Sequence, residues 1–215
     1  MATEAVTTHG LKELATPEAK ELAEMLLLRQ DLASSFQAMQ LWHKRYWQKE
    51  NGTPEDTLIA TCLFRDAILQ FIGCFDSTAQ YKLSVQDVYK STQGATEYFK
   101  WLKDIRDAYI AHKFGPHRQC IVGVFSDSNG TVIGNGHFVS VYLGPQEGAR
   151  DLIEFIAIAG RYLNSRIEDL QAQVLAAAKA MSKEDLNALP IARAYGVGPN
   201  ETRMTREKFK RSRSR

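Results

Sequence analysis

Cysteine is scarce in this sequence, and the features of secreted or membrane-spanning proteins are absent from it. The three cysteines, Cys62, Cys74 and Cys120, are odd in number and far apart, so they fit neither a disulfide framework nor a zinc site. We expect reduced and mostly buried thiols. No apolar run approaches the roughly 20 residues that span a bilayer, and the first ten residues lack the basic and apolar regions of a secretory signal. These absences predict a cytoplasmic protein.

Motifs for common cofactors are also missing. The sequence contains no Gly-rich phosphate loop, no nucleophile elbow and no paired-carboxylate motif. His112 and His117 lie five residues apart, but no third metal ligand of clear identity accompanies them. The glycines of IGNGHF (133–138) fit a hairpin better than a nucleotide site. We therefore expect neither a metal ion nor another cofactor.

The chain has an ordinary globular composition, with its positive charge concentrated at one end. Hydrophobic residues make up 44% and charged residues 24% of the sequence. The last fifteen residues hold seven basic and two acidic side chains, a net charge of +5, which leaves −3 of the total +2 for the first 200 residues. We read 191–215 as a disordered basic tail. It is either a solubilising end or an RNA-contacting arm through Lys208, Lys210 and Arg211.

Most of the remaining sequence has a helical pattern. Apolar residues at a spacing of three and four, with Ser, Thr and Pro at the starts, predict four long helices, at 17–50, 54–76, 95–113 and 146–181. Short helices are expected near 85–91 and from Ser182 to Pro190. A helix of about 35 residues spans about 50 Å, more than the core of a small domain. The length of the first and fourth long helices therefore predicts that they pack as an antiparallel pair or form a dimer interface.

The segment at about 120–143 is expected to be a β-hairpin inserted between the third and fourth long helices. Its residues are β-branched and aromatic, and Asn129 with Gly130 offers a hairpin turn. A second Asn-Gly pair at 135–136 could also form the turn, so the sequence does not decide the pairing register of the two strands. It also allows a β-bulge. The predicted layout is a flexible N-terminus at 1–16, a mainly helical domain at 17–190 that contains the hairpin, and the basic tail.

One short segment, DIRDAYIAHKFGPH (104–117), combines side chains suited to phosphate chemistry. Arg106 is followed by the polar Asp107 and, six positions after the arginine, by His112, near the end of an amphipathic helix. A histidine with a pKa near 6.5 serves as acid or base at neutral pH. Arginine supplies fixed positive charge and a forked set of donors for phosphate. These residue types suit proton transfer beside a bound phosphate group.

The string RDAYIAH (106–112) resembles the mark of the HEPN superfamily, in which an arginine, a polar residue and a later histidine lie at the end of a bundle helix. IRDAYIAHKF is also similar to the version in abortive-infection-type HEPN proteins, with Asp107 in place of the more frequent asparagine. The resemblance covers about 17–181. It implies an up-down four-helix bundle, mainly all-α, with the hairpin as an insertion.

The resemblance also implies an activity and partners. It implies a metal-independent endoribonuclease of toxin or phage-defence type that leaves a 2′,3′-cyclic phosphate. Arg106 would bind phosphate, Asp107 would orient the motif and His112 would act as general acid and base. The implied assembly is a homodimer in which two motifs form one cleft, with an antitoxin or a nucleotidyltransferase as a further partner. Many HEPN-like domains bind without cutting, so a non-catalytic module that binds nucleotide, RNA or a partner protein is the alternative.

Helix geometry supplies a competing interpretation of the motif. Six residues of an α-helix turn through about 600°, so Arg106 and His112 point about 120° apart on a straight helix. The arginine's length, a distorted last turn or a second chain would be needed to bring them together. Otherwise His112 is a half-buried histidine at a helix end, and Arg106 pairs with Asp66 or another exposed acid.

Further basic residues are candidates for RNA contact beside the motif. Lys113 and His117 follow it directly, and Arg65 interrupts the apolar second helix. The alternative for Arg65 is a buried ion pair with Asp66. The segment LWHKRYW (41–47) mixes aromatic and basic residues, which fits either a helix end packed on a neighbour or a surface on which RNA bases stack.

Overall fold

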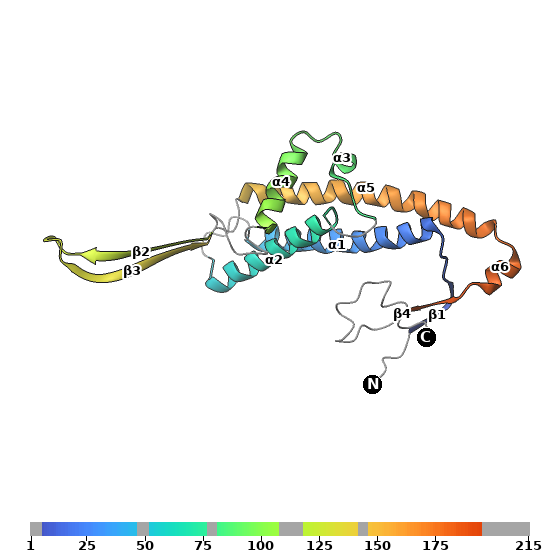
Figure 1. Ribbon diagram of the computed structural model, residues 1–215, viewed down its shortest axis with the longest axis horizontal. Helices are drawn as coiled ribbons and strands as arrows, with labels where there is room; N and C mark the ends of the chain where they lie inside the picture. Colours follow the sequence, from blue (N-terminus) through green and yellow to red (C-terminus); the bar gives the residue numbers. More distant parts are fainter. Residues whose placement is uncertain (1–5, 47–51, 77–80, 108–117, 142–145, 195–215) are drawn as a thin grey trace. The chain divides into compact units, whose positions relative to one another are not determined.

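The protein is mainly helical, as the sequence predicts. The computed structural model describes residues 6–46, 52–76, 81–107, 118–141 and 146–194 (Figure 1). The helices are α1 (Pro17–Tyr46), α2 (Pro54–Gly73), α3 (Val85–Val88), α4 (Ala95–Ile105), α5 (Gln146–Lys179) and α6 (Lys183–Ala188). The strands are β1 (Val6–Lys12), β2 (Arg118–Ser126), β3 (Val132–Val141) and β4 (Ile191–Ala194).

The chain divides into two compact units. The helical unit comprises Lys20–Ala172, and the terminal unit comprises Met1–Ala19 together with Gln173–Arg215. The strands pair as β1 with β4 and as β2 with β3, which gives two separate two-stranded antiparallel sheets. Within the described part of the chain, no helix combines the length and apolar character needed to cross a membrane.

The start of α2 shows why local sequence signals predict these helices well. The Thr53 side chain accepts a hydrogen bond from the backbone N–H of Asp56 at 3.1 Å, and Asp56 Oδ2 accepts one from the Thr53 N–H at 2.9 Å. Pro54 occupies the first helical turn, where its missing N–H costs nothing. This reciprocal capping box satisfies two backbone donors that the helix itself leaves without a partner.

Helices α1 and α2 run antiparallel and share a buried interface. Ser35 Oγ, fully buried in α1, donates a hydrogen bond to the Ala67 carbonyl of α2 at 2.8 Å. Later in α1, Trp42 packs against Phe64, earlier in α2, with ring centroids 6.4 Å apart. The polar contact matters because a buried hydroxyl without a partner would cost about 1–3 kcal/mol.

Helices α1 and α5 form the antiparallel pair that their length favours (Figure 1). Arg166, late in α5, donates two hydrogen bonds to Oε1 of Glu21, early in α1, at 2.6 and 3.0 Å. At the other end of the pair, Lys44 of α1 and Arg150 of α5 line the same hollow. Buried leucines and isoleucines of α5, among them Leu163, supply much of the core.

A cluster of aromatic rings fixes α4 against α2 and α5. Phe99 of α4 contacts Phe75 at the end of α2, with centroids 5.0 Å apart, and Tyr98 contacts Phe155 of α5 at 4.4 Å. The Tyr98 hydroxyl also donates to the Gly148 carbonyl at 2.6 Å. Each aromatic pair adds about 0.5–1.5 kcal/mol beyond its buried area. The cluster therefore packs α4 against α5 and against the residues that follow α2.

The expected β-hairpin is present, and its register is defined. The turn lies at Asp127–Thr131, where Gly130 has a φ of 80° and Asp127 Oδ1 accepts the N–H groups of Asn129 and Thr131. The Asn-Gly pair at 135–136 lies inside β3, with Gly136 opposite Gly123. The register shifts between Phe125 and Ser126, which is the irregularity that the sequence allowed.

The two chain ends, which are predicted to be flexible and disordered, contain a strand pair. Residues 1–16 were expected to be flexible and 191–215 disordered, yet β1 and β4 pair with each other, for example Val6 with Ala194. Lys12 Nζ donates to the carbonyl oxygens of Asn187 and Leu189 at 3.3 and 3.2 Å. The pairing joins segments about as far apart as the sequence permits, so no local pattern reveals it. Residues 195–215 lie outside the described part.

The cysteines also differ from expectation. Cys74 is buried, and burial raises the pKa of its thiol to about 12, with a smaller contribution from Asp31. Cys62 and Cys120 are exposed, so the prediction of mostly buried thiols is wrong. Cys62 lies on the outer side of α2, and Cys120 lies on the hairpin, where most side chains are exposed.

Candidate functional site

Arg106 directly follows the last residue of α4, where the α-helix passes into a π-helical turn. The backbone is π-helical at Arg106 and Asp107, and the Arg106 N–H donates to the carbonyl oxygens of both Leu102 and Lys103. Single π turns inside α-helices occur frequently at functional sites. The 120° separation between Arg106 and His112 assumed an unbroken α-helix, and this assumption fails at Arg106.

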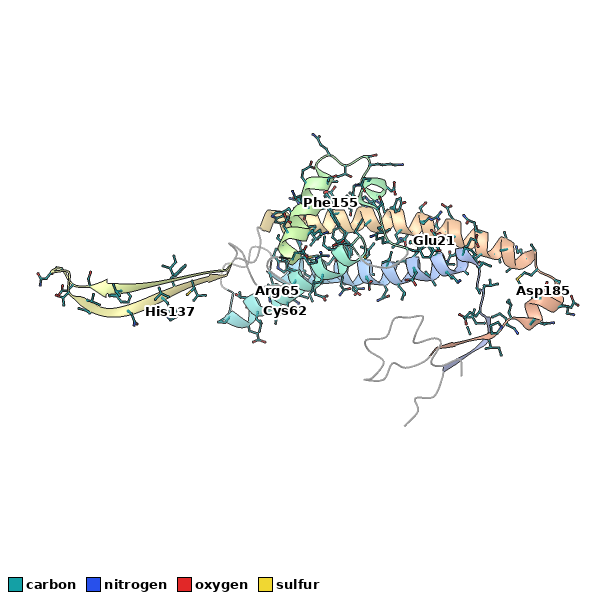
Figure 2. The ribbon with its side chains drawn as sticks, in the orientation of Figure 1. Glu21, Cys62, Arg65, His137, Phe155 and Asp185 are labelled. Atoms are coloured by element: carbon teal, nitrogen blue, oxygen red, sulfur yellow. The ribbon has the colours of Figure 1, made fainter. Side chains whose placement is uncertain are left out.

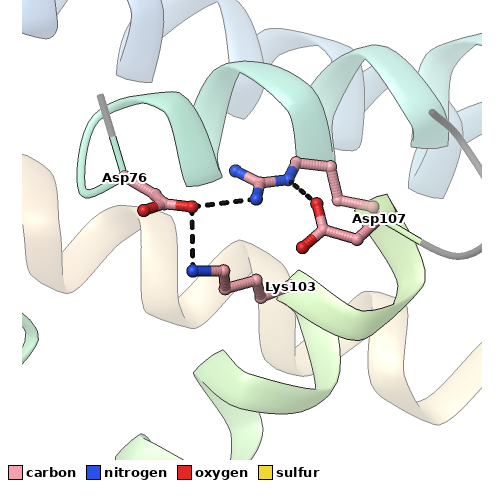
Figure 3. Close-up of polar contacts among 4 residues, drawn as sticks. Asp76, Lys103 and Asp107 are labelled. Atoms are coloured by element: carbon pink, nitrogen blue, oxygen red, sulfur yellow. Dashed lines mark hydrogen bonds and ion pairs between the residues drawn. The ribbon is translucent and has the colours of Figure 1, made fainter. Parts of the chain in front are cut away.

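The Arg106 side chain joins a network of four charged residues (Figure 3). Its Nε donates to Asp107 Oδ1 at 2.7 Å, and its Nη2 donates to Asp76 Oδ2 at 2.8 Å. Lys103 Nζ approaches the same oxygen of Asp76 at 3.0 Å. Asp76 follows the end of α2, whereas the other three residues come from α4 and its π turn. The network therefore connects the ends of two helices and sets the direction of the guanidinium.

The electrostatics of this network favour the ionised forms of Asp76, Asp107 and Arg106. Hydrogen bonds from Lys103, and then from Arg106, lower the pKa of the Asp76 carboxyl. A hydrogen bond from Arg106 lowers the pKa of the Asp107 carboxyl, and the two carboxylates, Asp107 first, raise the pKa of Arg106. Two carboxylates and two cations give a net charge of zero. A phosphate that binds Arg106 must compete with these carboxylates.

The exposure of the network shows how accessible it is. The side chain of Arg106 is 18% exposed, compared with 36% for Asp76 and 48% for Asp107. Partly exposed pairs of this kind contribute at most about 1 kcal/mol each, because water screens them. The two bonds to carboxylates use two of the five N–H donors of the guanidinium. The arrangement thus positions Arg106 without burying it.

The structure describes only part of the predicted site. Arg106 and Asp107 are in contact, and the role of Asp107 in orienting the motif stays a prediction. His112, Lys113 and His117 lie outside the described residues, as do the tail residues Lys208, Lys210 and Arg211.

Arg65 and Asp66 do not form the buried ion pair that the sequence analysis considered. Arg65 is half-buried on α2, but Asp66 is exposed and accepts a hydrogen bond from Gln70 Nε2 at 2.7 Å. The expected buried pair between Arg65 and Asp66 is wrong, because Asp66 faces solvent. The acid that Arg106 contacts across helices is Asp76, not Asp66.

Sequence reasoning missed two members of the network. Lys103 precedes Arg106 by three positions, a spacing that places two side chains on neighbouring parts of a helix surface. This spacing is the signal that could have identified Lys103. Asp76 has no such signal, because its contact depends on how α2 and α4 pack together.

A second feature lies at the far end of α1. A hollow of about 760 Å³ is lined from α1 by Phe36, Gln40, His43 and Lys44, and from α5 by Arg150, Ile153, Glu154 and Ala157. Trp42, in the same LWHKRYW segment, packs against Phe64 of α2. Packing on a neighbouring helix is therefore confirmed for Trp42, whereas Trp47 lies outside the described residues.

The described residues contain no group of three or more His, Cys, Asp or Glu side chains placed to hold a metal ion. Comparisons with protein-family models, with curated proteins and with solved structures found no match to this chain. The resemblance to HEPN proteins therefore depends on the RDAYIAH string and on the helical context around it.

Proposed function

We propose that this chain is a metal-independent endoribonuclease of toxin or phage-defence type that acts as a homodimer through Arg106 and His112. The observation that carries the proposal is the placement of Arg106. Its guanidinium is held at a π turn by Asp76 and Asp107 and stays partly exposed. A fixed, partly exposed guanidinium at the start of the motif is what recognition of a phosphate requires.

The proposed reaction moves two protons and exchanges one bond at phosphorus. A base takes the proton of the ribose 2′-hydroxyl, and the 2′-oxygen attacks the neighbouring phosphorus. The bond from phosphorus to the 5′-oxygen breaks, and an acid protonates the leaving oxygen. The products are a 2′,3′-cyclic phosphate and a 5′-hydroxyl, with no metal ion involved.

The side chains of the motif supply this chemistry in the proposal. His112 transfers protons, since the pKa of an ordinary histidine lies close to neutral pH. Arg106 stabilises the extra negative charge that develops on the phosphate oxygens. A homodimer would place two histidines at one cleft, so that one accepts a proton while the other donates one. An antitoxin or a nucleotidyltransferase would then control the activity in the cell.

A second function is favoured by the charge balance of the network. Asp76 and Asp107 already neutralise Arg106 and Lys103, and this balance reduces the attraction of the site for a polyanion. This observation favours the alternative of a non-catalytic HEPN-like module that binds nucleotide, RNA or a partner protein, and among these three ligands the neutral network disfavours a partner protein least. The two functions differ in one measurable respect, which is whether RNA is cut.

The deciding experiment is an RNA cleavage assay in the presence of EDTA. We expect the parent protein to cut, and the new ends to carry 2′,3′-cyclic phosphates, seen as a mass lower by one water than a linear phosphate end. Arg106→Ala should remove the activity. Lys100→Ala is the matched control, because Lys100 is an exposed cation of the same helix outside the network. RNA binding without any cleavage by the parent would support the non-catalytic function.

A further inference from the structure

Two cations of the network, Lys103 and Arg106, reach the same oxygen atom of Asp76. Nζ of Lys103 lies 3.0 Å from Oδ2, and Nη2 of Arg106 lies 2.8 Å from it (Figure 3). The cations are three positions apart, in α4 and in the π turn that follows it, whereas Asp76 follows α2. One part of the chain therefore supplies a pair of cations, and another part supplies the anion that they hold.

The contact between Arg166 and Glu21 shows how a simple ion pair joins two helices of this protein. Arg166 donates from Nε and Nη2 to Oε1 of Glu21, at 3.0 and 2.6 Å. Figure 2 shows Glu21 on α1, beside α5, which carries Arg166. At Asp76, by contrast, two cations from separate side chains share one carboxylate oxygen. Clamps of arginine and lysine are the means by which proteins hold the oxygens of phosphate groups.

The second acid of the network, Asp107, occupies a different donor of Arg106. Its Oδ1 accepts a hydrogen bond from Nε at 2.7 Å, and Asp107 directly follows Arg106 in the chain. This contact is made within one turn, so it does not depend on the segment that carries Asp76. Asp107 therefore keeps the guanidinium oriented when another anion replaces Asp76 at Nη2.

The position that Asp76 occupies is accessible from solvent. The side chains of Lys103 and Asp76 are 42% and 36% exposed. Water screens ion pairs at such exposure, so the carboxylate can exchange these contacts for water at little cost. A phosphodiester group of RNA carries one negative charge, as Asp76 does. The exchange of one for the other therefore leaves the charge of the site at zero.

We propose that Lys103 and Arg106 together bind one phosphate group of RNA, and that Asp76 occupies this place until RNA binds. The inference rests on the proposed function, since it takes RNA as the ligand of the same site. It goes further because it assigns a second phosphate-binding residue, Lys103, which lies outside the RDAYIAH string. It also gives Asp76 an autoinhibitory role. The network is neutral at rest because its own carboxylate fills the anion site.

The test measures the affinity of the full-length protein for an RNA that cannot be cut. A labelled single-stranded oligonucleotide with 2′-O-methyl groups keeps every phosphate but has no 2′-hydroxyl to attack phosphorus. Fluorescence anisotropy gives the affinity at several salt concentrations. Lys103→Ala should weaken binding about fivefold at physiological salt and lower the slope of log affinity against log salt by about 0.7–1 unit, because one phosphate contact is lost.

Two further variants of α4 serve as controls. Lys100→Ala removes the same charge from an exposed position one turn earlier, outside the network, and should keep the affinity and slope of the parent. Lys103→Arg retains a cation at the site and should restore most of the affinity. Because these positions face solvent or are only half-buried, the melting temperature of each variant should stay close to that of the parent.

The role of Asp76 is tested by combining substitutions. Asp76→Asn should tighten binding of the methylated RNA in the parent, because it removes the competing carboxylate. Most of this gain should be lost when Lys103→Ala is also present, since the pair of cations no longer exists. Equal gains with and without Lys103 would show that Asp76 acts only through the total charge of the protein, and its autoinhibitory role would be refuted.

The outcomes separate this inference from the ribonuclease activity. Cleavage of ordinary RNA by the parent, with equal affinities of Lys103→Ala and Lys100→Ala for methylated RNA, would overturn the inference and leave the activity in place. Weaker binding by Lys103→Ala alone supports the two-cation site even where the parent cuts no RNA, a result that contradicts the activity. A parent that binds neither RNA overturns both.

Discussion

Asp76 and Arg106 are 30 positions apart in the sequence, yet their side chains meet at 2.8 Å between Oδ2 and Nη2. Asp76 follows α2, and Arg106 follows α4, so the contact depends on how these two helices pack, and Phe75 and Phe99 contact each other across the same two segments. The arginine of the motif is thus oriented by an acid that lies outside the motif.

Removal of the Asp76 charge should strengthen RNA binding. Asp76→Asn keeps an oxygen that accepts a hydrogen bond from Arg106, and it raises the charge of the network from zero to +1. We expect tighter binding and a plot of log affinity against log salt that is steeper by about one unit. Fluorescence anisotropy with labelled RNA over a range of salt concentrations measures both quantities.

Asp66→Asn is the matched control, since Asp66 is an exposed acid of α2 whose hydrogen-bond partner is the neutral Gln70. The control should leave the salt dependence close to that of the parent. Equal effects of the two substitutions would mean that only the total charge matters. In that case the guanidinium of Arg106 would have no special part in binding RNA.

The network should also make stability depend on pH in a defined range. Hydrogen bonds from Lys103 and Arg106 lower the pKa of Asp76, and Arg106 lowers that of Asp107. A carboxyl with a lowered pKa in the folded state stabilises the protein above its unfolded pKa of about 4. This stabilisation is lost as the pH falls through the folded-state pKa.

Asp76→Asn should therefore flatten the loss of unfolding free energy below about pH 4. Because both carboxyls are substantially exposed, we expect the effect of each to stay below about 1 kcal/mol. Urea titrations at a series of acidic pH values measure the unfolding free energy. A variant that follows the parent at every pH would show that the Asp76 contacts are absent in solution.

The features that sequence analysis predicted correctly depend on local patterns. Thr53, Pro54 and Asp56 form a capping box within four residues, and Asp127 to Thr131 form the hairpin turn within five. Backbone sterics and nearby hydrogen bonds determine such features, whatever the rest of the chain does. The helix starts and the hairpin were therefore predictable from the sequence.

The features that sequence analysis did not predict depend on contacts between distant segments. The β1–β4 pair joins Val6 to Ala194, and the partner of Arg106 comes from another helix. Helix periodicity also gave no sign of the π turn at Arg106 and Asp107, because a single wide turn hardly changes the spacing of apolar residues. The motif was found from its residue types, whereas its surroundings required the fold.

Lysine should not replace the arginine of the motif. Arg106→Lys keeps the positive charge but loses the fork that donates from Nε to Asp107 and from Nη2 to Asp76 at once. We expect cleavage to fall by about 10²–10³, close to the loss in Arg106→Ala. A time course of RNA cleavage gives the rates. Activity close to that of the parent in Arg106→Lys would indicate that charge alone is needed.

The basic tail should contribute to RNA affinity without contributing to stability. A deletion of residues 201–215 removes a net charge of +5, including Lys208, Lys210 and Arg211. We expect weaker RNA binding, and a salt dependence reduced by several units of slope. The melting temperature should stay that of the full chain. Unchanged affinity and slope would leave the tail with a solubilising role.

His112 decides between catalysis and packing. If it transfers protons in an open cleft, His112→Ala should lower the rate of RNA cleavage by about 10²–10⁴ and leave the melting temperature nearly unchanged. EDTA should have no effect on the parent. If His112 is instead a packed histidine at a helix end, the same substitution should cost about 1 kcal/mol or more of stability, because it leaves a polar partner unsatisfied.

The two outcomes are separated by one cleavage gel and one melting curve on the same samples. Lys100→Ala, an exposed substitution on α4, should match the parent in both measurements. A destabilised His112→Ala variant of a parent that cuts no RNA would contradict the ribonuclease proposal. The contacts of Arg106 with Asp76 and Asp107 would then serve to hold the end of α4 against α2.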